Sequence, residues 1–155
     1  MAGLLNRRDA LALVGAGSAL ALSKPVIAVP GSPATTVLIE ETFLKANEGL
    51  RQDLTSFITK NWFVMDEEGV KQGIFTSYWL MEDIDENAEW DLVMAVGYPQ
   101  AGGYEEPATK TKFNAIRAAH NEILINGKRL KELGRIVRHH RLKLSGGNSR
   151  ITTRI

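Results

Sequence analysis

Cysteine is absent from the 155 residues of this sequence. Its absence excludes disulfide bridges, thiolate nucleophiles and thiolate metal sites. Other signatures are missing as well: the Gly-x-Ser-x-Gly elbow of serine hydrolases, the His-x-x-His and His-Glu-x-x-His spacings of zinc sites and, beyond the N-terminal segment, a glycine-rich phosphate loop. The sequence therefore predicts no metal site, and none of its motifs indicates a particular cofactor.

A basic and then apolar segment opens the chain. Arg7 and Arg8 precede residues 10–22, thirteen positions without a charge, and the small-residue site Val26-Ile27-Ala28 follows. This order predicts a signal peptide over residues 1–28, since the apolar run is shorter than the roughly 20 residues that cross a bilayer. The segment resembles a twin-arginine signal peptide, which implies a periplasmic or secreted location; an N-terminal anchor is the alternative. Cleavage would leave 127 residues (155 − 28) with no membrane-spanning segment.

Charge is divided unevenly along the chain. Residues 29–127 hold seven basic and sixteen acidic side chains, whereas residues 128–155 hold nine basic ones and the single acid Glu132. Opposite charges attract, so these two parts are expected to pair, within one subunit or between subunits. Nucleic-acid binding is the alternative use of a basic segment, but no helix-turn-helix or aromatic-rich signature accompanies it. The sequence therefore predicts no nucleic-acid partner.

Residues 73–98 form the clearest structural signal. The stretches 73–81 and 90–98 are rich in β-branched, aromatic and other apolar residues, and the acidic run 82–87 between them consists mostly of residues that strands avoid. This composition predicts two antiparallel strands joined by a turn. A turn of carboxylates can attract a divalent cation, but this one lacks the glycine and distal glutamate of an EF-hand loop. A solvated turn is the favoured interpretation.

Alternation and helical spacing extend the prediction to both sides of this hairpin. We expect a strand at 36–45, a helix at 49–61 and a loop at 66–69. A second helix begins at Pro107, and its apolar stripe runs through Phe113, His120 and Leu124, with an extension at 130–133. The last strand, 135–144, places Ile136, Arg138 and His140 on one face and Val137 and His139 on the other. Residues 29–35 are expected to be a flexible lead and residues 145–155 a flexible tail around one domain at 36–144.

The order strand, helix, strand, strand, helix, strand predicts an α+β fold of the ferredoxin-like βαββαβ type, a four-stranded antiparallel sheet with two helices on one face. The other face would expose apolar side chains unless a second copy covers it. Within 36–144, the helix with Trp62, the hairpin with Tyr78-Trp79 and Trp90-Asp91, and the closing strand resemble the dimeric α/β-barrel superfamily. The resemblance implies a homodimer. Activities in that superfamily range over cofactor-free oxygenation, haem chemistry and isomerisation, so the fold by itself implies little about function.

Histidines are the sharpest candidates for chemistry. His120 falls on the expected stripe of the second helix, where it would be a haem ligand, a general base facing a pocket, or a core histidine bonded to a backbone carbonyl. Haem is therefore the one cofactor left open. His139 and His140 are neighbours on a strand and point to opposite faces. They cannot form a joint metal pair within one chain, and which of them faces the interior of a barrel stays open; His140 is a candidate ligand contact.

The central hairpin supplies the remaining candidates. Asp91 is a candidate catalytic base if it faces the barrel interior beside Tyr78, because burial would raise its pKa; the alternative is an edge or surface carboxylate. Tyr78 is the other candidate catalytic group of the hairpin. Trp79, Trp90 and Tyr98 are candidate ligand contacts, and the alternative for Tyr98 is a ring that packs over the strand end.

These features predict an exported homodimer whose sheets enclose a largely apolar pocket for a small hydrophobic or aromatic molecule. Any catalysis would be cofactor-free oxygenase- or isomerase-type chemistry, and whether the protein is an enzyme stays open. The alternative is a non-catalytic subunit that docks an exported partner through its open sheet face. Mixed polar and aromatic residues around a cavity would favour the ligand, and a tight aliphatic layer would favour the interface.

Overall fold

The computed structural model describes residues 34–85 and 87–146. The expected signal peptide at 1–28, most of the expected lead at 29–35 and residues 147–155 of the expected tail lie outside these ranges. In chain order the elements are β1 (Leu38–Ala46), α1 (Arg51–Phe57), the π-helix η1 (Ile58–Trp62), α2 (Phe63–Lys71), β2 (Ser77–Glu82), β3 (Leu92–Tyr98), the 3₁₀ turn η2 (Gly103–Glu105), α3 (Pro107–Ala119), α4 (Leu130–Leu133) and β4 (Gly134–Lys143).

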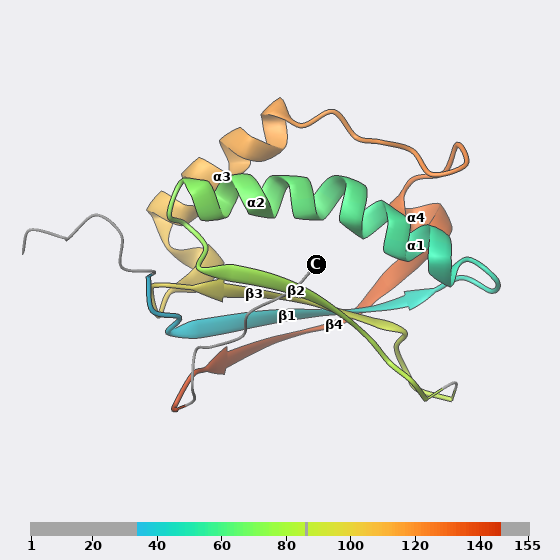
Figure 1. The fold of residues 1–155 in the computed structure, drawn as a ribbon, viewed down its shortest axis with the longest axis horizontal. Coiled ribbons are helices and arrows are strands. Elements are labelled where there is room, and N and C mark those ends of the chain that lie inside the picture. Colours follow the sequence, from blue (N-terminus) through green and yellow to red (C-terminus); the bar gives the residue numbers. More distant parts are fainter. Residues whose placement is uncertain (1–33, 86, 147–155) are drawn as a thin grey trace, which may run out of the picture. The chain divides into compact units, whose positions relative to one another are not determined.

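Four strands form one antiparallel sheet in the order β2-β3-β1-β4. Figure 1 shows helices α2 and α3 on the same face of this sheet. The expected α+β ferredoxin-like arrangement is thus confirmed. β1 and β3 form the centre of the sheet because they bury residues on both faces: Leu44 and Leu92 are fully buried toward the helices, and Ala95 is buried on the other side.

The first helical segment is longer than the sequence predicted. α1, η1 and α2 follow one another without a break from Arg51 to Lys71, so the expected loop at 66–69 is wrong. The acidic residues there suggest a loop by composition, but Asp66 is only 5% exposed and lies on the inner side of α2. Gly69 allows close packing rather than a helix end, because a Cβ at this position would overlap the Phe75 ring.

The second helix is shorter than predicted. α3 ends at Ala119 and His120 is already extended, so the expected stripe through His120 and Leu124 is wrong. The physical reason is the side-chain amide of Asn61 in η1. It donates to the carbonyl oxygen of Ile123 (2.9 Å) and accepts from the N–H of Ile123 (2.7 Å), which fixes this segment in an extended conformation.

A β-bulge interrupts β4. Phe43 and Leu44 of β1 pair with Arg138 and Ile136, so Val137 is an extra residue between them. Ile136 therefore faces the helices with Leu44, while Arg138 faces the open side of the sheet. The expectation that Ile136 and Arg138 share one face is wrong because simple alternation fails across a bulge.

Two apolar clusters fill the space between sheet and helices. The first consists of Leu44, Leu54, Phe57, Ile58, Leu92, Met94, Ile125 and Leu133. The second consists of Leu38, Ile74, Phe75, Tyr98, Phe113 and Ile116. Within the described ranges, the structure contains no helix that is both long enough and apolar enough to cross a membrane.

Basic side chains of β4 pair with acidic side chains of earlier elements, as the charge distribution predicted. Arg141 Nε lies 3.2 Å from Glu40 Oε1, and Arg138 lies 3.7 Å from Glu89 Oε2. Exposed pairs of this kind contribute little stability, about 0–1 kcal/mol each. Their main effect is to orient the β4 side chains.

The open sheet face is the side of the sheet that no helix of the described chain covers. Its centre is aromatic: the Phe43 ring contacts Trp90 and His140 at centroid distances of 4.9 and 5.0 Å, and the Arg138 guanidinium stacks on Phe43 and Trp90. By register, this face consists of Ile39, Glu41, Phe43, Trp79, Met81, Val93, Ala95, Arg138, His140 and Leu142.

Candidate functional site

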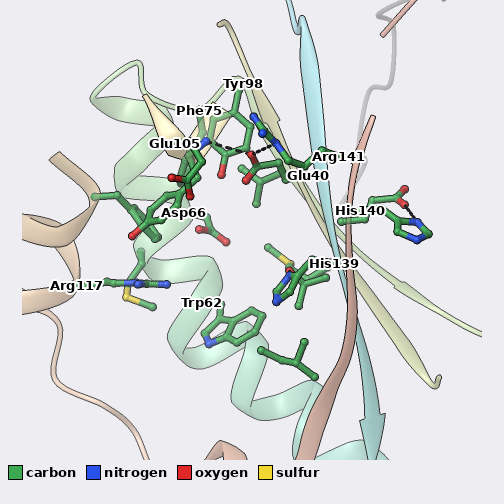
Figure 2. Close-up of a pocket in the computed structure, with 18 residues that line it drawn as sticks. Glu40, Trp62, Asp66, Phe75, Tyr98, Glu105, Arg117, His139, His140 and Arg141 are labelled. Atoms are coloured by element: carbon green, nitrogen blue, oxygen red, sulfur yellow. Dashed lines mark hydrogen bonds and ion pairs between the residues drawn. The ribbon is translucent and has the colours of Figure 1, made fainter. Parts of the chain in front are cut away.

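A cavity of about 440 Å³ lies between the sheet and helices α2 and α3. Its floor is the helix-facing side of β1, β3 and β4, and its other walls come from η1, α2, η2 and α3 (Figure 2). A space of this size admits a small organic molecule. Aromatic, thioether and charged side chains line it together, among them Trp62, Met65, Asp66, Phe75, Tyr98, Phe113, Arg117 and His139.

Asp66 projects from α2 into this cavity (Figure 2) and is 5% exposed. No group of the described chain hydrogen-bonds to its carboxyl group. Burial raises the pKa of Asp66 to about 7, and the positive charge of Arg117 opposes part of that rise. A carboxyl group that titrates near neutral pH can take up or release a proton under physiological conditions, as general acids and bases do.

One end of the cavity is closed by polar contacts between β1, β4 and η2. Glu40 accepts a hydrogen bond from the N–H of Tyr104 (3.2 Å) and pairs with Arg141 (3.2 Å), which in turn donates to the carbonyl oxygen of Gly102 (2.7 Å). Tyr98 is 4% exposed at the same end. Burial and the carboxylate of Glu40 raise the pKa of Tyr98, so its hydroxyl group keeps its proton.

The remaining walls are mainly apolar. Figure 2 shows Trp62 of η1 and His139 of β4 on facing sides of the cavity. His139 Nδ1 lies 3.1 Å from Thr42 Oγ1, which fixes the orientation of the imidazole. Met65 and Met94 also line the cavity, with flexible thioether side chains.

Tyr98 and His140 are among the residues that line the cavity, whereas Trp79 and Trp90 are not. The His140 imidazole itself leaves β4 on the opposite face of the sheet, where it packs against Phe43 (Figure 2). Trp79 lies on the open sheet face, and Trp90 packs against Phe43 there. Of the two neighbouring histidines, His139 therefore faces the cavity.

Tyr78 and His120 lie at a second, shallower groove between α2, α3 and β2. The Tyr78 hydroxyl donates to Glu67 (2.9 Å), and burial together with this bond raises the pKa of Tyr78 to about 12. His120 Nε2 lies 2.9 Å from Asn61 Oδ1. This nitrogen is therefore engaged by a side chain rather than by a backbone carbonyl, and it is not free to bind a haem iron.

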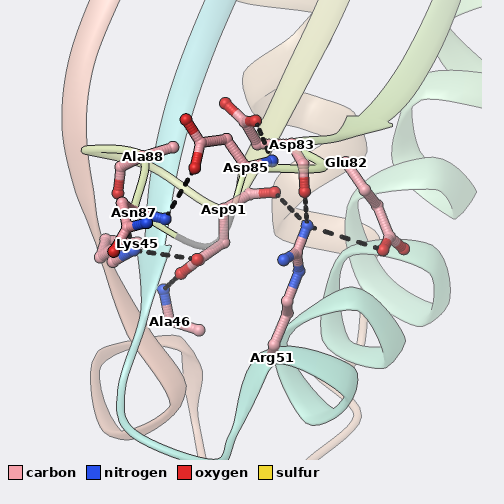
Figure 3. A network of polar contacts seen from close by, with 9 residues as sticks. All are labelled: Lys45, Ala46, Arg51, Glu82, Asp83, Asp85, Asn87, Ala88 and Asp91. Atoms are coloured by element: carbon pink, nitrogen blue, oxygen red, sulfur yellow. Dashed lines mark hydrogen bonds and ion pairs between the residues drawn. The ribbon is translucent and has the colours of Figure 1, made fainter.

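Asp91 belongs to a polar network at the base of the hairpin rather than to the cavity (Figure 3). Its carboxylate accepts hydrogen bonds from the N–H of Ala46 (2.7 Å) and from Lys45 Nζ (3.0 Å). Arg51 donates to the carbonyl oxygens of Asp83 and Asp91 and so ties the hairpin to α1. Burial favours a higher pKa for Asp91, but the bonds from Ala46 and Lys45 outweigh it and hold the pKa below its usual value.

This network predicts a structural role for Asp91. Asp91→Asn is expected to lower the free energy of unfolding by about 1 kcal/mol at neutral pH, because the amide loses the charge that Lys45 pairs with. The depressed pKa means that this contribution is present above the unfolded-state pKa and disappears as pH falls through the folded-state value. Urea unfolding at neutral and acidic pH measures it. Glu48→Gln, at an exposed position, is the control, and an equal loss at both pH values would contradict the interpretation.

The acidic turn bonds to its own backbone. Asp83 Oδ1 accepts from the N–H of Asp85 (2.9 Å), and Asp85 Oδ1 accepts from the N–H of Asn87 (3.0 Å). Across the described ranges, no cluster of three or more histidine, aspartate or glutamate side chains is arranged to hold a metal ion.

Asp66 and Arg117 are two charged cavity residues that the sequence analysis missed. A signal for them exists in the spacing: Ile58, Trp62 and Asp66 are four residues apart and share one helix face, as do Phe113 and Arg117. An acid that continues an apolar stripe indicates a buried carboxyl group. The neighbouring glutamates and Gly69 obscured this signal because they suggested a loop.

Comparison with known proteins supports the fold. No family model matches the sequence, and no curated protein matches it. A solved dimeric ferredoxin-like protein from an uncultured marine organism is similar, with 14% identity, a TM-score of 0.50, and coverage of 77% of this chain and 96% of that one. At this identity the likeness shows the ferredoxin-like fold and nothing of the activity.

Two further solved structures are similar to this chain at lower TM-scores. One is a conserved protein of unknown function from Bacteroides thetaiotaomicron, described as a possible oxidoreductase, with 12% identity, a TM-score of 0.41, and coverage of 72% of this chain and 100% of that one. The other is a cofactor-independent oxygenase from Streptomyces nogalater, with 10% identity, a TM-score of 0.44, and coverage of 73% and 97%.

Proposed function

We propose that this protein binds a small hydrophobic or aromatic molecule in the cavity between its sheet and helices α2 and α3. The observation that carries the proposal is the lining, which combines aromatic walls from Trp62, Phe75 and Phe113 with the buried polar group of Asp66. Small-molecule sites have this composition, mainly apolar with a few placed polar groups.

Filling the cavity tests this proposal. Ile136 lines the cavity and is 42% exposed, so Ile136→Trp puts an indole into the space without disturbing a buried core position. Native mass spectra of the wild type, purified from its exporting host, should show a small adduct that Ile136→Trp loses. Ile84→Trp, at a hairpin position that is 99% exposed, is the control and should keep the adduct. Equal occupancy in wild type and Ile136→Trp would contradict the proposal.

We also propose that two copies of the chain pair through the open sheet face. This face exposes Met81 and Leu142 at 45% each and carries the ring cluster around Phe43. Apolar area of this kind is normally covered in soluble proteins, and a two-fold axis lets one surface cover itself. The similar marine protein is dimeric, which supports the same arrangement here.

Leu142→Arg is expected to convert the dimer into a monomer, because it places a charge within the apolar contact between the two copies. Sedimentation equilibrium measures the mass. Ile123→Arg is the matched control, since Ile123 is 47% exposed but lies in the segment after α3. A monomeric wild type would instead support the alternative, a face that docks a different exported partner.

Two properties complete the proposal. The chain is exported and cleaved after Ala28, so protein isolated from the periplasm or medium should begin at Val29, and an intact Met1 would contradict this. The reaction class we propose is cofactor-free oxygenase- or isomerase-type chemistry. Such reactions move a proton of the substrate, and the cavity-facing carboxyl group of Asp66, with its pKa raised to about 7, can exchange a proton near neutral pH. Asp66→Asn should then lose turnover while it keeps the adduct.

A further inference from the structure

Asp66 is a buried carboxyl group that faces the cavity and has no hydrogen-bond partner among the described residues. We propose that Asp66 and Arg117 together bind the carbonyl oxygen of an aromatic or conjugated ketone or quinone. This inference rests on the proposed function, because it assigns a chemical class to the molecule that the cavity holds.

The first step is the unsatisfied hydrogen-bonding capacity of Asp66. Buried polar groups are almost always paired, and an unpaired one is costly. Asp66 is 5% exposed, and no described residue hydrogen-bonds to its carboxyl group. The group points into open space (Figure 2), so a bound molecule is the partner that this geometry accommodates.

The second step is the direction of the hydrogen bond. Burial raises the pKa of Asp66 to about 7, so much of the population carries a proton at neutral pH. A protonated carboxyl group donates one O–H and therefore needs an acceptor on the ligand. A carboxylic acid kept neutral by an apolar site is known to serve in this way as a donor to a carbonyl or enolate oxygen.

The third step is the neighbouring guanidinium group. Arg117 of α3 stacks on Tyr104 and Phe113, with its Cζ 5.7 and 5.1 Å from the two ring centroids. No described acid pairs with it within 4 Å, yet its charge acts on Asp66. Both side chains line the same cavity, and we infer that the Arg117 N–H groups and Asp66 serve the same ligand oxygen. A positive charge here disfavours an ammonium ligand and favours an oxygen on which negative charge develops.

The other titratable groups around the cavity already have partners. Glu40 pairs with Arg141, Glu105 pairs with Lys110 (2.9 Å), and His139 bonds to Thr42. The titratable side chains that line the cavity together with Asp66 are Glu40, Glu41, Tyr98, Tyr104, Glu105, Arg117, His139, His140 and Arg141. The three carboxylates among them also disfavour a ligand with a full negative charge. A neutral carbonyl compound fits this balance.

Two probes of nearly the same shape test the assignment. 2-Acetylnaphthalene carries a carbonyl oxygen and 2-ethylnaphthalene does not. We expect the wild type to bind the ketone about tenfold more tightly at mildly acidic pH, where Asp66 is protonated, a difference equivalent to one hydrogen bond. This preference should shrink as pH rises through about 7, because the ionised carboxylate repels the oxygen. Affinity for the hydrocarbon should not change with pH.

Three variants separate the donor from a general effect on the fold. Asp66→Asn keeps an N–H donor and should keep the preference but lose its pH dependence. Asp66→Leu keeps only the Arg117 donor, so its preference for the ketone should be smaller than that of the wild type and should not change with pH. Glu48→Gln, at an exposed position, should behave as the wild type. The infrared carbonyl stretch of bound 2-acetylnaphthalene should lie at lower frequency in the wild type than in Asp66→Leu.

The outcomes distinguish the two levels of the proposal. Equal affinity of both probes at every pH, or an unchanged preference in Asp66→Leu, would overturn the inference and leave the ligand-binding cavity standing. If neither probe binds, the cavity is not a site for aromatic molecules, and both the proposed function and the inference fail.

Discussion

Asp66→Asn is expected to raise the free energy of unfolding by about 4 kcal/mol above neutral pH, an unusually large gain for one substitution. Burial raises the pKa of the Asp66 carboxyl group to about 7 in the folded chain, against an ordinary value of 3.8 for aspartate. Each pKa unit corresponds to about 1.4 kcal/mol, so holding this group charged in the folded state costs roughly that sum. Asparagine fills the same volume and carries no charge.

Whether wild-type stability rises or falls with pH depends on which state, folded or unfolded, binds more protons. Between pH 3.8 and about 7 the unfolded chain has lost the Asp66 proton while the folded chain still holds it. The folded state then binds more protons, so wild-type stability falls as pH rises across this interval and levels off above it. The advantage of Asp66→Asn should therefore be near zero at the acid end and complete on the alkaline side.

Urea unfolding of wild type and variant across this interval measures the effect. Glu48→Gln removes an exposed carboxylate, so its difference from the wild type should stay within about 0.5 kcal/mol at every pH. An Asp66→Asn variant that is less stable than the wild type above neutral pH would show that the carboxylate is paired in the folded protein. Such a result would also remove the basis for its role as a donor to a ligand.

If asparagine at position 66 makes the protein more stable, packing does not account for the carboxyl group. Natural chains are seldom near their stability optimum, and the recurrent reason at a binding site is that a strained or unpaired group serves the ligand. The cavity combines this cost with an aromatic wall and with the guanidinium of Arg117, which forms no ion pair with a described acid. Stability and ligand recognition make opposite demands on the same position.

The fold was predictable because its strands and helices follow local rules. The β-branched and aromatic stretches 73–81 and 90–98 with the acidic turn between them predict the β2–β3 hairpin, and apolar spacing on both sides of it predicts the order of the elements. The site was less predictable because its key residue violates those rules. Asp66 lies in an acidic run whose composition predicts a loop. Only the four-residue intervals from Ile58 to Trp62 and from Trp62 to Asp66 indicate that its side chain faces inward.

The other errors have a shared physical cause, namely tertiary contacts that override local pattern. His120 and Leu124 continue a helical stripe in the sequence, yet α3 ends at Ala119 because Asn61 captures Ile123 from across the structure. Val137 looks like an alternating strand residue, and only its pairing with β1 reveals the bulge. Long-range contacts of this kind leave no periodic signal in one sequence.

Asn61 is accordingly the position where we expect the second large effect. Asn61→Ala is expected to lower the free energy of unfolding by about 3 kcal/mol, because the loss leaves several polar groups without partners at once. Its amide is 2% exposed. It donates to the carbonyl oxygens of Phe57 (3.0 Å) and Ile123 (2.9 Å), and it accepts from the N–H of Ile123 (2.7 Å).

The π-helix is the reason that this amide can reach the segment after α3. In η1 the N–H of Phe63 bonds to the carbonyl oxygen of Ile58, five residues back. Such widened turns often redirect a side chain for a specific purpose. Here the redirected amide joins η1 to residues 120–123, and the adjoining Ile125 belongs to the core cluster around Leu54.

Urea unfolding measures the loss, and hydrogen exchange of the Ile123 amide locates it. His120→Ala is the matched control, since it removes only the bond from His120 Nε2 to Asn61 Oδ1 (2.9 Å) and should cost about 1 kcal/mol. If the two variants lose the same amount, the imidazole rather than the amide holds the segment. If Asn61→Ala is as stable as the wild type, water has replaced the amide, and the early end of α3 must have a cause within residues 107–124 themselves.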